Sequence, residues 1–65
     1  MNDFKLRMFK EFDELSDRIE KLKSFIVTDR FDLLPEIERI DLKEQLRHME
    51  QYRDVLSRRV SRQCD

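Results

Sequence analysis

Aromatic and basic side chains gather in two places along the first half of the sequence, and residues of these types can bind a nucleotide. Phe9 and Phe12 lie close to Lys5 and Lys10. The second group comprises Lys21, Lys23, Phe25, Thr28, Arg30 and Phe31. A base can stack on a flat ring, while cations or hydroxyl donors hold its phosphate. The plainer interpretation is structural, because aromatic residues at helical spacing usually pack in a core and lysines beside them extend into solvent.

Catalytic chemistry finds weaker support. His48 has Glu44 one helical turn before it, which is the spacing of an ordinary surface ion pair. Cys64 is the only cysteine and follows the last apolar position, so no surroundings are expected to activate its thiol. One histidine and one cysteine are too few for a four-ligand zinc site. We therefore expect a protein that is not an enzyme, with no cofactor and no metal.

The first element that must position these groups is a long helix, expected over residues 3–27. Asn2 or Asp3 can cap its start. Its apolar residues alternate at spacings of four and three, which is an uninterrupted heptad seam. They are Met8, Phe12, Leu15, Ile19, Leu22 and Ile26. On the opposite face, Glu14 and Arg18 are spaced to form an ion pair.

A helical turn over residues 28–35 is expected to follow. Thr28 is a suitable cap for a single turn, and Phe31 and Leu34 can then close the end of the molecule. Pro35 disfavours helical geometry at Leu34 and suits the first turn of a second helix.

The second long helix is expected over residues 36–62, with residues 63–65 as a tail. Its apolar positions are Ile37, Ile40, Leu42, Leu46, Met49, Tyr52, Leu56 and Val60. Two long helices joined by a short helical turn predict an all-α antiparallel helical hairpin, with residues 1–65 as a single domain.

Length and composition indicate that this hairpin self-associates. The chain has 65 residues, of which 45% are charged and 38% hydrophobic, with no glycine and one proline, a composition typical of long helices. A chain this short buries too little surface to be stable without a disulfide, a metal or oligomerisation, and one cysteine excludes an internal disulfide. Two helices can cover one seam, but they leave flanking apolar residues exposed, which usually marks an association surface. Those residues are Phe4, Phe9, Phe25, Ile37 and Tyr52.

Charge and hydropathy exclude two classes of partner. The net charge of −1 provides no overall polycation to hold DNA or RNA. No apolar run approaches the length of a membrane span, and the N-terminus lacks the apolar region of a signal peptide. We expect a cytoplasmic protein with no membrane partner and with Cys64 reduced.

Three segments together resemble a known family. They are EFDEL at residues 11–15, FIVTDRFDLLP at 25–35 and QLRHMEQY at 45–52, followed by Leu56, Arg59 and Val60. Over residues 11–60 this pattern resembles a family of short phage proteins similar to the anti-CBASS type 2 sponges. The turn together with the segment from Gln45 to Tyr52 is distinctive, whereas each half alone is a weak signal.

The resemblance implies a homo-oligomer, typically a hexamer, that sequesters cyclic di- and trinucleotides without cleaving them and so starves bacterial CBASS effectors. In that family an aromatic residue near the start of the first long helix stacks on a base. A basic residue and a Thr or Ser near the turn contact the ligand across a protomer interface. Carried over here, the ligand-binding candidates are Phe12 with Phe9, Thr28, and Arg30 or Lys23, with Arg59 or Arg62 for a second, trinucleotide-type site. Phe12 keeps the stacking face of the more usual tyrosine and lacks its hydroxyl.

Two alternatives remain beside this hypothesis of a phage anti-defence protein in the infected cell. The first is a small structural or interaction protein whose exposed apolar helix face docks on a host or phage protein. In that case Phe12 and Thr28 serve only packing and capping. The second is a nucleic-acid-binding hairpin, which the acidic balance and the scattered arginines disfavour.

Overall fold

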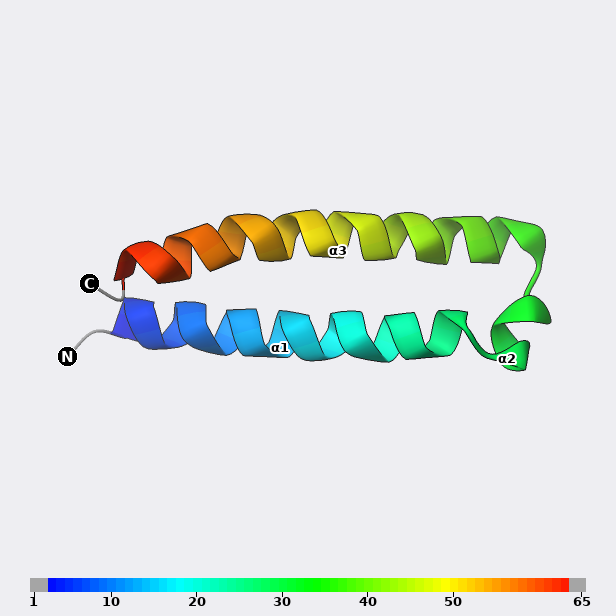
Figure 1. Cartoon of the computed structure of the whole chain (residues 1–65), viewed down its shortest axis with the longest axis horizontal. Helices are drawn as coiled ribbons and strands as arrows, with labels where there is room; N and C mark the ends of the chain where they lie inside the picture. The colour runs from blue at the N-terminus through cyan, green and yellow to red at the C-terminus, as the bar shows by residue number, and fades with distance from the viewer. Residues whose placement is uncertain (1–2, 64–65) are drawn as a thin grey trace.

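A computed structural model describes residues 3–63, which form the helices α1 (Asp3–Ile26), α2 (Asp29–Asp32) and α3 (Glu36–Gln63). The long helices α1 and α3 lie side by side and antiparallel, and α2 caps one end of the pair (Figure 1). The rod measures 48 × 15 × 15 Å, so it is about three times as long as it is wide. The predicted all-α helical hairpin is confirmed.

The helix ends lie close to the positions expected from the sequence. α1 ends at Ile26, one residue before the predicted end, and α3 continues through Gln63, which was expected to begin the tail. The carboxylate of Asp3 lies in the first turn of α1, where it complements the positive end of the helix dipole. Asn2, the other candidate cap, and Cys64 lie outside the described residues.

The core is a narrow row of side chains between α1 and α3. Met8, Leu15, Ile19 and Leu56 are at most 5% exposed, and they form one cluster. Half-buried side chains flank it: Phe12, Leu46, Met49 and Val60. The heptad seam of α1 therefore faces α3 as predicted. So few fully buried side chains fit the expectation that a chain of this length is marginally stable on its own.

Several apolar residues of the α3 series lie outside this core. Ile37 is 63% exposed, Ile40 52% and Tyr52 44%, and Val55 is 44% exposed as well. A single hairpin has only one helix to pack against α3, so its other side faces solvent. The sequence prediction that Ile37 and Tyr52 cannot be covered by one seam agrees with this arrangement.

Thr28 sets the geometry of the turn. Its Oγ1 donates a hydrogen bond to the carbonyl of Phe25 at 2.6 Å and accepts one from the amide of Phe31 at 3.4 Å. The hydroxyl therefore ends α1 and begins α2 as the N-cap, which is the role predicted for it. Phe31 is 3% exposed and closes the end of the hairpin, while Leu33, two residues later, is 84% exposed.

Beyond the turn, Pro35 provides the first acceptor of α3. Its carbonyl accepts hydrogen bonds from the amides of Glu38 and Arg39 at 3.0 and 3.1 Å. The ring of Pro35 costs no hydrogen bond here, because the first amides of a helix have no partner within the helix.

Across residues 3–63, neither long helix contains a stretch apolar enough to cross a bilayer.

Candidate functional site

The start of α1 and the end of α3 bring an aromatic ring and a guanidinium together. The Cζ of Arg59 lies 5.9 Å from the centre of the Phe4 ring, within the range of a cation–π contact. Phe4 is 52% exposed, so part of its ring remains open to solvent. The family resemblance suggested Arg59 as a ligand residue, whereas the sequence pattern placed Phe4 only among the flanking apolar residues. We call Phe4, Phe9, Phe12 and Arg59 the terminal cluster.

Phe12 lies deeper than the other aromatic residues of the terminal cluster. Its ring packs against the buried cluster formed by Met8, Leu15, Ile19 and Leu56, and it is half-buried. Phe9 is half-buried too. Both therefore contribute to the hairpin, and only their exposed portions can take part in stacking on a base.

The opposite end of the rod carries the second candidate group. Phe25 and Phe31 meet edge to face, with ring centres 6.0 Å apart and an interplanar angle of 88°. The Nζ of Lys43 lies 5.7 Å from the centre of the Phe31 ring. Lys43 lies two turns into α3, so its position in the sequence did not predict that it approaches the turn. The one feature of the sequence that could have indicated Lys43 is that it is the first lysine after the turn.

The cationic side chains at this end differ in whether they already contact a carboxylate or a carbonyl group. Lys23 lies 3.9 Å from Glu50 on α3, and Arg39 donates hydrogen bonds of 3.0 Å to the carbonyls of Asp32 and Leu34. Arg30 is exposed, and no partner of its side chain is found within residues 3–63. Arg30 and Lys43 are therefore the cations best placed to meet a phosphate. We call Lys23, Thr28, Arg30 and Lys43 the turn cluster.

The two clusters are far apart in one copy of the chain. Sixteen residues of α1 and the turn separate Phe12 from Thr28, which is about 24 Å along a helix. Within residues 3–63 of a single copy the surface holds no pocket. A site that combines an aromatic residue of the terminal cluster with a cation of the turn cluster therefore requires two copies of the chain.

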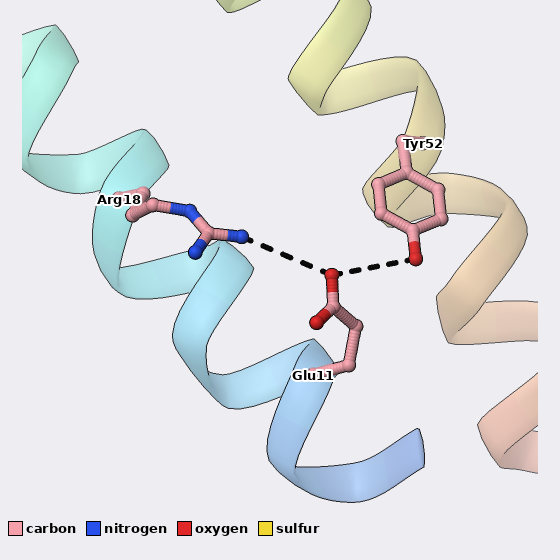
Figure 2. A network of polar contacts seen from close by, with 3 residues as sticks. All are labelled: Glu11, Arg18 and Tyr52. Carbon is pink, nitrogen blue, oxygen red and sulfur yellow. Dashed lines mark hydrogen bonds and ion pairs between the residues drawn. The ribbon is translucent and has the colours of Figure 1, made fainter. Parts of the chain in front are cut away.

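A polar network joins the two long helices near the middle of the rod. Tyr52 of α3 donates a long hydrogen bond of 3.4 Å to Oε2 of Glu11 on α1, and Arg18 approaches the same oxygen at 3.8 Å (Figure 2). The helical spacing predicted that Arg18 pairs with Glu14, and this prediction is wrong. Arg18 instead approaches Glu11, which lies at the α1–α3 boundary. The carboxylate of Glu11 also accepts the hydrogen bond from Tyr52 there.

The remaining candidates for chemistry are ordinary surface groups. His48 Nε2 lies 3.6 Å from Glu44 Oε1, and both side chains are nearly 60% exposed, as the helical spacing predicted. Among the described residues, no three acidic, histidine or cysteine side chains are grouped closely enough to hold a metal ion. No polar or charged residue in this part of the chain is buried.

The fold and the two clusters define a class of protein, a capped two-helix hairpin with aromatic and cationic groups at both ends. The chain belongs to the Sequestin family, whose sequence profile matches residues 2–62. No curated protein and no solved structure shows significant similarity to the chain.

Proposed function

We propose that this protein binds a cyclic di- or trinucleotide immune signal of the CBASS type and withholds it from its effector without cleaving it. The match to the Sequestin family spans almost the entire chain, and the name of that family denotes sequestration. This supports a role in capturing a small molecule. The nature of the ligand is argued from the two clusters.

The observation that carries the proposal is an exposed aromatic ring with a cation at one end of the rod and exposed cations beside a buried ring at the other. A cyclic dinucleotide has two bases and two phosphates, so it needs flat faces and positive charges at more than one point. Phe4 with Arg59, and Lys43 with Arg30, offer such groups on the surface. Thr28 adds a hydroxyl at the turn, although that hydroxyl already bonds to Phe25 and Phe31.

We propose binding without turnover because of the chemistry of these groups. Aromatic rings, an ammonium and guanidinium groups stabilise a bound nucleotide by stacking and by charge-assisted hydrogen bonds. His48, the one histidine in the sequence, lies in the middle of α3 in an exposed pair with Glu44 and belongs to neither cluster.

Sequestration then acts by mass action. The protein depletes its ligand only where binding sites outnumber signal molecules and the Kd lies well below the signal concentration. Ligand held between two copies would also stabilise the assembly, because any molecule that binds only the folded state raises its apparent stability.

The test is a thermal-shift and calorimetry series with cyclic dinucleotides, cyclic trinucleotides and the matching linear dinucleotides. We expect one cyclic ligand to raise Tm by several degrees and the linear controls to leave it unchanged. Heating the complex and recovering the ligand by chromatography then separates binding from cleavage, and we expect intact ligand. A folded protein that responds to none of these molecules would overturn the proposal and favour docking on a protein partner.

Substitutions assign the site once a ligand binds. Arg30→Gln should weaken binding, while Lys21→Gln, which also removes one exposed positive charge, should not. Lys21 pairs with Asp17 at 3.0 Å on the surface of α1 and lies outside the turn cluster as the structure defines it, so it is a matched control. Phe12→Leu keeps an apolar side chain against the core and removes the flat ring, which tests stacking without emptying the core.

A further inference from the structure

Positive charge is concentrated at the end of the rod where α1 begins and α3 finishes. Residues 3–10 of α1 and residues 56–63 of α3 lie together at this end (Figure 1). They carry six lysines and arginines and one carboxylate, a net charge of +5. Residues 11–55 carry eight cations and thirteen carboxylates, a net charge of −5. The small net charge of the chain therefore conceals a strong separation of charge along the rod. We call residues 3–10 and 56–63 the basic end.

The helix dipole explains only the part of this charge that α3 contributes. The last turn of a helix favours cations, as at the end of α3, whereas the first turn favours carboxylates. Asp3 follows this rule, but Lys5, Arg7 and Lys10 follow it in the first two turns of α1 and do not obey the rule. Like charges gathered in one place also destabilise a folded chain. The stability of the helices therefore does not account for the basic end.

Much of this charge is available to an anion. Four cations of the basic end are exposed and make no ion pair within residues 3–63. They are Arg7, Lys10, Arg58 and Arg62. An anionic partner is the ligand that such a group of cations complements.

Two exposed apolar side chains accompany the cations. Phe4 is 52% exposed and Leu6 is 59% exposed, both in the first turn of α1. Because they are two positions apart, they lie about 200° apart around the helix, on nearly opposite sides of it. Helical side chains lean toward the N-terminus of their helix, which at α1 is the end of the rod. A partner that contacts both residues at once therefore approaches the rod end-on.

We infer that the basic end docks on an anionic lipid surface, with the rod standing on its end. The interface of a bilayer offers an apolar layer for Phe4 and Leu6 and, just outside it, phosphate groups for the surrounding cations. A net charge of −1 disfavours such a partner only where the charge is evenly spread. The finding that neither long helix of residues 3–63 can cross a bilayer concerns insertion, and surface binding requires no spanning helix.

The same residues fit other anionic partners less well. Single-stranded nucleic acid is bound through its phosphates and through stacking of its bases on aromatic rings. Leu6 has no ring for a base to stack on, and it lies on the other side of α1 from Phe4. The basic end of a second copy carries the same charge and is repelled. A lipid surface is the partner that complements both the charge and the two apolar side chains.

A tryptophan reporter tests the docking and its orientation. The chain has no tryptophan, so the emission of Leu6→Trp reports on this position alone. We expect its emission to shift to the blue with vesicles of equal parts phosphatidylcholine and phosphatidylglycerol, and to stay unchanged with phosphatidylcholine alone. Leu33→Trp, at a position 84% exposed at the other end of the rod, is the matched reporter and should not shift. No shift at Leu6→Trp, or equal shifts at both positions, overturns the inference.

Vesicle sedimentation tests the role of the charges. Arg7→Gln with Arg58→Gln should weaken binding to the mixed vesicles at least tenfold, because each basic residue near an anionic surface strengthens binding roughly fivefold. The control Lys21→Gln with Arg47→Gln removes the same charge outside the basic end and should bind as the native protein does. Salt at 1 M, where the Debye length is about 3 Å, should release the native protein. Equal binding by the two double variants overturns the inference.

A third measurement separates lipid from nucleic acid. The native protein is titrated with single-stranded oligothymidine, and we expect it to bind this polyanion more weakly than the mixed vesicles. Tighter binding of the oligonucleotide overturns the inference and favours a nucleic-acid partner. None of these measurements includes a cyclic nucleotide, so their outcome is independent of the proposed function.

Discussion

The guanidinium of Arg59 lies 5.9 Å from the ring centre of Phe4, and this contact joins the last turns of α3 to the first turn of α1. Lys43 makes the same kind of contact with Phe31 at the other end, at 5.7 Å. Each end of the hairpin is thus closed by a cation over a phenylalanine ring. The groups proposed to bind ligand therefore also help to hold the helix ends together.

Arg59→Gln is expected to loosen the terminal end of the hairpin without unfolding it. An exposed cation–π contact contributes about 0.5–1 kcal/mol, and in a domain of this size 1 kcal/mol shifts Tm by roughly 4–8 °C. A loss of a few degrees should therefore appear by circular dichroism. The double variant with Phe4→Leu provides the control, because the two effects should be less than additive. Fully additive losses would mean that the ring and the guanidinium do not interact.

Leu56→Ala is expected to unfold most of the protein at 37 °C. Leu56 is 1% exposed and is the only fully buried side chain that α3 contributes to the core cluster within the described residues. Removing its side chain should cost about 2–5 kcal/mol, a large part of the roughly 3–10 kcal/mol available to a chain of this length. Urea titration measures the change. Val27→Ala, at a position 84% exposed, is the matched control and should leave the midpoint almost unchanged.

The sequence was sufficient to predict the hairpin because its signals are local. Heptad spacing placed Leu15 and Ile19 in the seam, and the capping hydroxyl of Thr28 marked the turn before Phe31. Contacts between the helices are different, since they depend on the rotation of α3 against α1. That rotation brings the hydroxyl of Tyr52 on α3 within 3.4 Å of the Glu11 carboxylate on α1.

The candidate site was predictable only in part for the same reason. Residue types suggested Thr28 and the family resemblance suggested Arg59, but the register of the hairpin determines which ring the guanidinium of Arg59 approaches. The contacts of Phe4 with Arg59 and of Lys43 with Phe31 arise only from the packing of α3 against α1 and the turn. Whether Phe9, Phe12, Lys23 or Arg30 contacts a ligand stays a prediction.

Thr28→Ala is expected to destabilise the turn, whereas Thr28→Ser should not. The alanine removes the hydroxyl that caps α2 and bonds back to the carbonyl of Phe25, a change that typically costs about 0.5–2 kcal/mol. Serine retains both hydrogen bonds. Amide hydrogen exchange should show faster exchange at Phe31 in the alanine variant alone. Equal protection in both variants would show that the hydroxyl is not what holds the turn.

Lys43→Gln separates the binding role of the turn cluster from its structural role. If the ammonium over Phe31 contacts a phosphate, a charge-assisted hydrogen bond of about 1.5–3 kcal/mol is lost, and the Kd for the cyclic nucleotide should rise by more than tenfold. The loss of the cation–π contact should lower Tm only slightly, by the same reasoning as for Arg59. Calorimetry at two salt concentrations measures the Kd, and the variant should show a weaker dependence on salt because one phosphate contact fewer is made. Lys21→Gln, with an equal loss of charge on α1, should keep the native Kd. If Lys43→Gln binds as tightly as the native protein while Arg30→Gln does not, the phosphate lies on the Arg30 side of the turn and Lys43 serves only to cover Phe31.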